Sequence, residues 1–179
     1  MKKRLFVFIG DGGSGKTTLI SELTMQYPEK FRKVVTCTSR PMRIGEVDGE
    51  DYHFLPESYF RDNPNLVLIK RTRDGNYYGT RKEDLQVTTH HSLLTLRFSG
   101  IKKLENLGLN HIAVVRILIS EALKIERMRQ RGDTEEMITH RLVFDATDKA
   151  NVDYGNFPII NLYATQSLEE NIERILLAC

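Results

Sequence analysis

The residues with the most specific chemistry lie near the start of the chain. Gly10, Gly15, Lys16 and Thr17 match the pattern G-x-x-x-x-G-K-[ST], which follows an apolar run and opens a helical one. Glycines in such a loop let several backbone N–H groups turn towards one anion, and the following helix N-terminus adds a favourable dipole. The pattern therefore predicts a loop that binds the phosphates of a nucleoside triphosphate.

The side chains of this loop predict a co-substrate and a metal. Lys16 should reach the β- and γ-phosphates and take part in catalysis, and the Thr17 hydroxyl should be a ligand of Mg²⁺. We therefore expect ATP and Mg²⁺. The predicted nucleotide-binding residues are Gly10, Asp11, Gly12, Gly13, Ser14, Gly15, Lys16, Thr17 and Thr18.

Two arginines and two tyrosines predict a second phosphate site. Arg40 and Arg43 are three residues apart in the sequence, and a proline follows the first of them. Two guanidinium groups at that spacing can hold a phosphate monoester. Tyr52 and Tyr78 can each donate a phenolic hydrogen bond to the same oxygens. A chain with two phosphate sites suits a transfer between two phosphorylated molecules.

Strands and helices that alternate at both ends of the chain must position these groups. Apolar runs predict strands at 5–9, 93–98, 112–119 and 157–162. Helices are expected at 16–27, 101–107, 121–131, 134–144 and 167–177. The alternation predicts an α/β fold, a parallel sheet flanked by helices. The segment 34–81 breaks this rhythm with short strands and turns, and predicts a separate small β-rich lobe.

Composition narrows the function classes. The chain has 179 residues, of which 40% are hydrophobic and 28% charged, as in a globular domain. The net charge of +2 without a long Lys/Arg run does not indicate a nucleic-acid partner, and no apolar run approaches a membrane span. Cys37 and Cys179 lack metal-ligand spacing and favour the cytoplasm, with Cys37 buried. His90 and His91 are expected to be exposed loop residues.

Two segments resemble the guanylate kinase family, P-loop enzymes that phosphorylate GMP. They are VTCTSRPMRIGEVDGEDYHF at 35–54 and GNYYGT at 75–80, and the likeness extends over almost the whole chain. The resemblance implies a P-loop NTPase-type core, a small β-rich acceptor-binding lobe and a helical lid. The implied bounds are 1–33, 82–121 and 142–179 for the core, 34–81 for the lobe and 122–141 for the lid.

The resemblance also implies roles for individual residues. The acceptor's phosphate would be bound by Arg40, Arg43, Tyr52 and Tyr78. Arg127, Arg131 and Arg141 match the lid and its flanks, where positive groups stabilise the charge of the moving phosphoryl group. Thr36 and Thr80 stand where the family has hydroxyl residues that contact the base. Asn161 would help to place the adenine side of ATP, or would belong to an ordinary turn at a strand end.

Three positions depart from the family in the part that recognises guanine. Ile69 replaces a glutamate that accepts hydrogen bonds from the base, and an aliphatic side chain cannot do so. Thr95 and Arg97 replace two aspartates that support Mg²⁺ and the guanine amino group. Arg97 could donate to a base carbonyl or a second phosphate, or pair with an acid such as Asp11 or Asp74.

Several functions follow as expectations. An ATP-dependent nucleoside monophosphate kinase with GMP or dGMP as acceptor is the family default. A kinase of the same fold acting on another nucleotide, a modified nucleotide or a sugar phosphate is the alternative. A non-catalytic module that binds phosphorylated ligands belongs to a different class, and the complete loop at 10–17 disfavours it. A GTPase lacks support, because no N-K-x-D pattern is present. Small nucleotides are the expected partners, and no obligate protein partner is evident.

Overall fold

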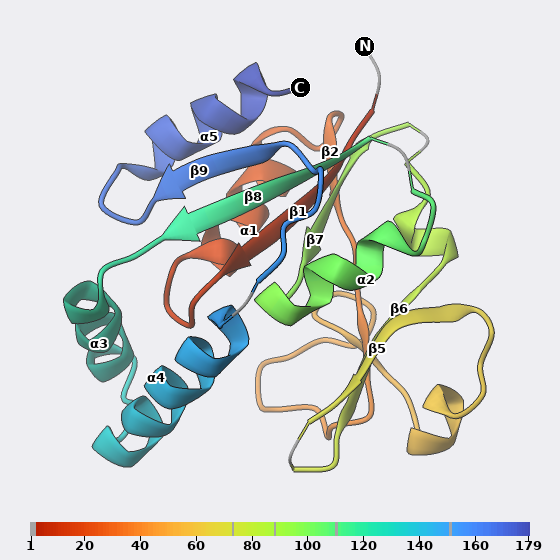
Figure 1. Ribbon diagram of the computed structural model, residues 1–179, viewed down its shortest axis with the longest axis horizontal. Helices are drawn as coiled ribbons and strands as arrows, with labels where there is room; N and C mark the ends of the chain where they lie inside the picture. Colours follow the sequence, from red (N-terminus) through yellow and green to blue (C-terminus); the bar gives the residue numbers. More distant parts are fainter. Residues whose placement is uncertain (1–2, 73, 88, 110, 151) are drawn as a thin grey trace.

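A parallel five-stranded sheet with the strand order β2-β7-β1-β8-β9 forms the centre of the protein (Figure 1). The computed structural model describes residues 3–72, 74–87, 89–109, 111–150 and 152–179. The strands are β1 (Leu5–Gly10), β2 (Phe31–Lys33), β7 (His91–Thr95), β8 (Ile112–Leu118) and β9 (Ile159–Tyr163). Strand β1 pairs in parallel with both β7 and β8, so its carboxyl end opens in the middle of one sheet edge. Ligands commonly bind at this place in open α/β sheets.

Helices cover both faces of this sheet, which explains why its strands are almost wholly apolar. Helices α1 (Lys16–Gln26) and α5 (Leu168–Leu177) bury Leu23 and Ile175 against one face. Helix α2 (Ile101–Glu105) and the 3₁₀ turn η3 (Phe98–Gly100) cover the other face with Leu104 and their neighbours. The predicted α/β fold with a parallel, helix-flanked sheet is confirmed.

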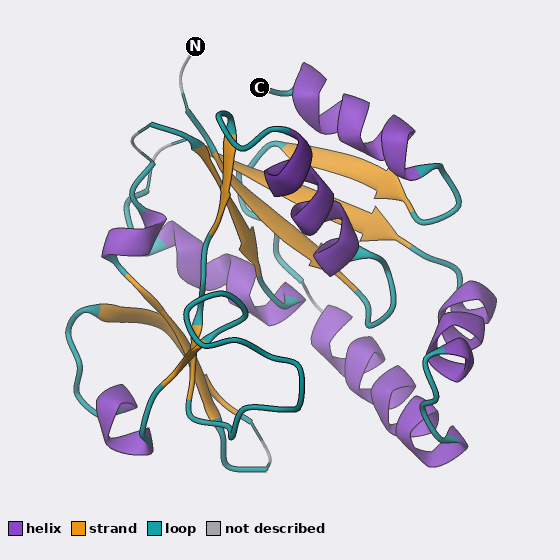
Figure 2. Cartoon of the chain, turned by 180° about the vertical axis from the view of Figure 1, so that it is seen from behind, coloured by secondary structure: helices purple, strands orange, loops and turns teal. Residues whose placement is uncertain are grey.

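A second, smaller sheet has the order β4-β3-β6-β5 (Figure 2). Its strands are β3 (Cys37–Thr38), β4 (His53–Phe54), β5 (Leu66–Arg71) and β6 (Tyr77–Arg81). They all lie within the range 34–81 that the sequence marks as a β-rich lobe. The sheet has a small core of its own around Cys37, Phe60 and Leu66. Cys37 is fully buried, as predicted, and this burial raises the pKa of its thiol.

Two helices follow β8 and extend beyond the edge of the parallel sheet (Figure 1). They are α3 (Glu121–Gln130) and α4 (Glu135–Lys149), and α4 continues past the predicted end at 144. Ser120 and Thr134 cap them by accepting hydrogen bonds from Leu123 N and Met137 N. Within the described ranges, none of the helices has the length and apolar character needed to cross a membrane.

The structure corrects several local predictions. Strand β2 lies just before the β-rich lobe, at the edge of the parallel sheet, and is not among the strands predicted from the sequence. The predicted strand at 93–98 is displaced to β7, and only its last residue, Phe98, belongs to η3. Two 3₁₀ turns, η1 (Glu57–Phe60) and η2 (Glu83–Leu85), lie within and just after the β-rich lobe.

The expectation of an exposed His91 is wrong. Its side chain is buried in β7, where Nδ1 accepts a hydrogen bond from Arg4 N at 3.1 Å. The ring packs between Phe6 and Phe31, with centroids 5.5 Å from each. Burial lowers the pKa of His91 to about 4, so it is a neutral core residue.

Candidate functional site

The phosphate-binding loop connects β1 to α1 in a backbone conformation that only glycines suit. A Cβ atom on Gly10 would lie 2.8 Å from Ser14 Oγ and 2.9 Å from the carbonyl oxygen of Ile117. Gly15 caps α1 with a φ of 97°, in the left-handed region that favours glycine. The loop is thereby shaped to expose its N–H groups at the helix N-terminus, where an anion is stabilised.

Lys16 is folded back onto this loop. Its Nζ donates to the carbonyl oxygens of Gly10 at 2.7 Å and Asp11 at 2.8 Å. Burial lowers the pKa of Lys16 to about 8, so the ammonium is largely charged at neutral pH. A charged group held by backbone dipoles and partly desolvated is suited to exchange these contacts for phosphate oxygens.

A cavity of about 470 Å³ lies beside the loop. This volume is in the range of nucleotide-sized sites. Residues 13–19 line it from the loop and α1, and Arg127 and Arg131 line it from the side of α3. Gln166 and Asn171 close the opposite wall. The guanidinium of Arg127 bridges the loop and the wall, because it donates to Gly13 O at 3.1 Å and to Ala164 O at 2.9 Å.

Two of the three arginines of the predicted lid contact the same carboxylate. Arg131 and Arg141 both contact the carboxylate of Asp133, the latter with Nε 3.7 Å from Oδ2. The Arg131 guanidinium holds the pKa of Asp133 below its usual range. Asp133 is a residue that the sequence prediction missed, and its only signal was its place beside Gly132 in the turn between α3 and α4.

A buried group of charges lies behind the phosphate-binding loop. The Asp11 carboxylate pairs with Lys124 at 3.2 Å and Lys149 at 2.6 Å, and does not face the nucleotide cavity. Asp145 Oδ2 accepts from Gly12 N at 3.1 Å and lies 3.4 Å from Lys124 Nζ. These contacts join the loop to both α3 and α4. Lys124, Asp145 and Lys149 have no motif signal, and only the fold brings them together.

The residues of the predicted second phosphate site are grouped around a guanidinium–carboxylate pair. Arg40 forms two hydrogen bonds with Glu46, at 2.6 and 2.8 Å, and its guanidinium lies 5.2 Å from the centroid of the Tyr52 ring. Arg43 N also donates to Glu46, and the Tyr52 and Tyr78 rings are 6.0 Å apart. The structure thus brings the four predicted residues together.

Glu46 is a further residue of this site that the sequence prediction missed. The hydrogen bonds from Arg40 lower the pKa of Glu46 to about 2, and raise that of Arg40. The carboxylate therefore stays charged across the working pH range and keeps the Arg40 fork in one orientation. The feature of the sequence that could have indicated Glu46 is its position three residues after Arg43.

Comparison with known proteins decides the family. A sequence model described as "Guanylate kinase" matches residues 2–175 of this chain. The chain belongs to the guanylate kinase family. The guanylate kinase of Gloeobacter violaceus is 33% identical over 183 residues, which cover 97% of this chain and 86% of the relative. That of Paraburkholderia xenovorans is 31% identical over 173 residues, covering 93% and 76% respectively.

Solved structures support the fold. The crystal structure of guanylate kinase from Anaplasma phagocytophilum has a TM-score of 0.70 at 22% identity, covering 98% of this chain and 84% of that chain. A gluconokinase from Sinorhizobium meliloti has a TM-score of 0.54 at 17% identity, covering 98% and 92%. The family resemblance stated from the sequence is therefore confirmed, and the chain is a phosphotransferase.

The positions that the family resemblance assigns to base contacts lie in or beside the small sheet. Ile69 packs with Phe60 and Cys37 in the core of the small sheet. Thr80 is buried in β6, whereas Thr36 is half-buried, and its carbonyl oxygen accepts from His53 N. Thr80 thus lies within the small sheet and Thr36 just before β3, and Ile69 adds no polar group to the sheet.

Arg97 and Asn161 have definite partners. The Arg97 guanidinium lies 4.3 Å from the centroid of the Phe144 ring. The two acids considered for it contact other groups, because Asp11 pairs with lysines and Asp74 accepts from Asn76. Asn161 accepts from Arg116 Nε at 2.9 Å in the middle of β9. Asn161 alternates along the strand with Leu162, which faces α1 and α5, so it points away from the nucleotide cavity.

Proposed function

We propose that this chain transfers the γ-phosphoryl group of ATP to GMP or dGMP. The observation that supports the proposal is that the chain has two separate groups of residues suited to binding phosphate. One is the complete loop at 10–17 with its cavity, and the other is the Arg40–Tyr52–Tyr78 cluster on the small sheet. A kinase that joins a triphosphate and a monophosphate needs both, whereas a module that only binds phosphorylated ligands has no use for the first.

We assign the following roles in phosphoryl transfer to individual residues. Lys16 and the loop N–H groups hold the β- and γ-phosphates, while Arg127, Arg131 and Arg141 approach the moving phosphoryl group from the lid. Arg40 and Arg43, with the two tyrosine hydroxyls, hold the acceptor's phosphate. Phosphoryl transfer asks mainly for positioning and for compensation of negative charge, so these groups need no protein nucleophile.

The site also suits Mg²⁺. The Thr17 side chain is exposed at the start of α1, beside the cavity. In the part of the chain that the structure describes, no three His, Cys, Asp or Glu side chains form a metal cluster. Mg²⁺ commonly takes few protein ligands and completes its shell with substrate phosphates and water. The Thr17 hydroxyl would hold it, and the bound ion would neutralise charge on the β- and γ-phosphates.

We further propose that the protein works in the cytoplasm on small nucleotides. Cys37 and Cys179 are both free thiols, as a reducing compartment allows. The nucleotide substrates of the proposed reaction are found there.

A coupled assay of ADP release tests the proposed function. With Mg²⁺ and ATP present, we expect GMP and dGMP to be turned over at least about tenfold more efficiently than AMP, CMP, UMP, dTMP or sugar phosphates, because a bidentate contact to a base is worth about 1–3 kcal/mol of discrimination. Efficient turnover of another acceptor, with GMP poor, would assign the chain to a different substrate. ATP and GMP binding without any transfer would favour the binding module.

Arg43→Ala should raise the KM for GMP by about tenfold or more with a smaller change in kcat, because a charge-assisted hydrogen bond to phosphate is worth about 1.5–3 kcal/mol. The assay is steady-state kinetics with GMP varied at saturating ATP. Arg61→Ala is the matched control, since this exposed arginine of the same lobe pairs with Glu57. An unchanged KM in Arg43→Ala would remove Arg43 from the clamp.

A further inference from the structure

Strand β5 contains an irregularity that changes which side chain faces the space between the two sheets. Val67 pairs with Thr80 and Lys70 pairs with Tyr78, so three steps along β5 match two along β6. Leu68 has a φ of 56°, as expected of a residue within a bulge. Lys70 therefore takes the place opposite Tyr78 that Ile69 would hold in a regular ladder. Paired residues point to the same face, so Lys70 shares its face with Tyr78 of the phosphate clamp.

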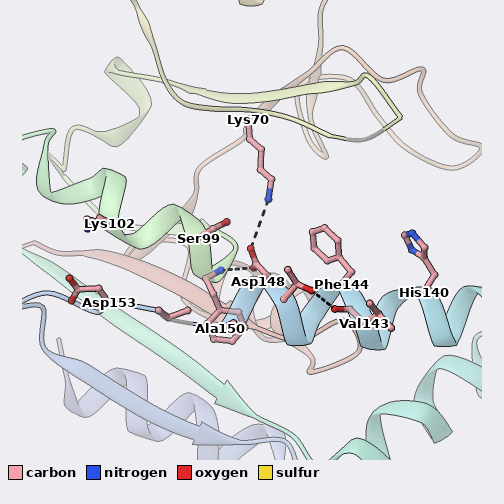
Figure 3. A pocket seen from close by; sticks show the side chains of 12 residues that line it. Lys70, Ser99, Lys102, His140, Val143, Phe144, Asp148, Ala150 and Asp153 are labelled. Atoms are coloured by element: carbon pink, nitrogen blue, oxygen red, sulfur yellow. Dashed lines mark hydrogen bonds and ion pairs between the residues drawn. The ribbon is translucent and has the colours of Figure 1, made fainter.

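Lys70 extends from the small sheet towards Asp148 on α4 (Figure 3). The Nζ and Oδ1 atoms are 3.9 Å apart, which is too far for a hydrogen bond. The other carboxylate oxygen, Oδ2, accepts from Phe98 N at 3.0 Å. The Asp148 side chain is only 6% exposed, so a buried carboxylate has one oxygen fixed by the backbone and the other directed at Lys70.

These two residues line a cavity of about 420 Å³ between the small sheet, η3 and α4. Phe144 presents its ring to the same cavity one turn before Asp148 (Figure 3). The Lys70 ammonium and the Arg97 guanidinium both approach this ring, at 5.4 and 4.3 Å from its centroid. The cavity thus combines an aromatic wall, a donor and an acceptor, which is the composition of a site for a flat polar ring.

The donor and acceptor match one edge of guanine. That edge carries O6, an acceptor, next to the N1–H and 2-amino donors. An ammonium can only donate and a carboxylate can only accept, so the pair complements this order. Adenine presents the reverse order, a 6-amino donor next to an N1 acceptor. Its donor would face the Lys70 ammonium, and its acceptor would face the Asp148 carboxylate.

We propose that Lys70 and Asp148 are the specificity-determining residues for the acceptor base, with Lys70 donating to O6 and Asp148 accepting from N1–H and the 2-amino group. This assignment rests on the proposed GMP kinase function and deepens it. It supplies the carboxylate that Ile69 cannot provide, from α4 instead of β5. The edge of the base would face both charged groups side by side, and at their separation of 3.9 Å they form no mutual hydrogen bond that the base must break.

Asp148→Asn gives the sharpest test. The amide oxygen can still accept from Phe98 N, while the amide NH₂ replaces the accepting oxygen that faces the cavity. Xanthine differs from guanine by an oxygen in place of the 2-amino group. The amide NH₂ can donate to this oxygen, so the variant should bind XMP better and GMP worse than the wild type does. We expect kcat/KM for GMP to fall at least about tenfold, and the XMP-to-GMP ratio to rise at least about tenfold. Equal losses with both acceptors would mean a merely structural role and would overturn the proposal.

Lys70→Met tests the other half. In this variant, kcat/KM should fall for GMP and IMP, which both carry O6. The ratio of kcat/KM for GMP to that for AMP should also fall. Matched controls come from the same cavity: Asp153→Asn and Lys102→Met make the same charge changes at its rim and should leave the acceptor ratios unchanged. An unchanged GMP-to-AMP ratio in Lys70→Met would remove Lys70 from base recognition.

Calorimetric titration separates this proposal from the function on which it rests. Binding of GMP and XMP to the wild type and to Asp148→Asn requires no phosphoryl transfer. Suppose that the wild type binds GMP better than XMP and that the variant binds XMP better than GMP. The pair then recognises the base, and this result holds even if the coupled assay shows no turnover and the kinase function fails. If the wild type turns over GMP and the variant keeps the same binding order, the kinase function stands and the pair is refuted.

Discussion

Lys16→Ala is expected to lower kcat by about 10³-fold with the fold retained. Removing one preorganised donor from a site of developing charge costs about 10²–10³ in rate, and Lys16 is placed to contact two phosphates. Its pKa is lowered to about 8 by burial, which means that the fold disfavours its charged form. Loss of the ammonium should therefore leave the free energy of unfolding at neutral pH little changed.

The measurement is the rate of ADP formation at saturating ATP and GMP, together with urea unfolding of the same preparation. Lys30→Ala is a suitable control, because this exposed lysine lies just before β2 and its ammonium lies over the Tyr27 ring, away from the loop at 10–17. The control should retain full activity. Activity of Lys16→Ala near that of the wild type would show that the loop does not hold the triphosphate.

The parts of the site that are local in sequence could be predicted from the sequence. Gly10 to Thr17 form one loop whose spacing alone dictates the geometry, and Arg40 and Arg43 lie within one turn. Glu46, Asp133 and Asp145 act through partners that are brought close by turns or by packing, and a single carboxylate in a charged segment has no distinguishing pattern. Such residues become visible only when the helices and loops are placed.

The bulge in β5 shows a second limit of sequence reasoning. The sequence comparison assigns the base-reading position to Ile69 and finds an aliphatic side chain there. One extra residue in the strand turns Ile69 into the core of the small sheet and Lys70 towards α4. A slip of one residue exchanges the two faces of a strand. Neither the composition nor the alternation of the sequence reveals this slip, because Ile69 and Lys70 can each be accommodated on either face.

Lys124→Met is expected to lower the free energy of unfolding by about 3–5 kcal/mol, the usual cost of removing one partner from a buried ion pair. Lys124 is buried, and its ammonium lies between the carboxylates of Asp11 and Asp145. Methionine fills similar space without charge, so Asp145 would lose its paired lysine, and Asp11 would keep only its pair with Lys149 among the salt bridges of the described residues. Urea unfolding followed by circular dichroism gives the change.

Two companion variants separate the charge effect from the loss of packing. Arg129 lies on α3, as Lys124 does, and forms an exposed pair with Glu135 at the start of α4. Arg129→Met breaks this pair and should leave the unfolding midpoint nearly unchanged. Adding Asp145→Asn to Lys124→Met removes one uncompensated charge while an amide oxygen can still accept from Gly12 N, so part of the stability should return. If the double variant is less stable than Lys124→Met, the loss comes from packing and hydrogen bonds, and the buried charges behind the phosphate-binding loop are not what couples that loop to α3 and α4.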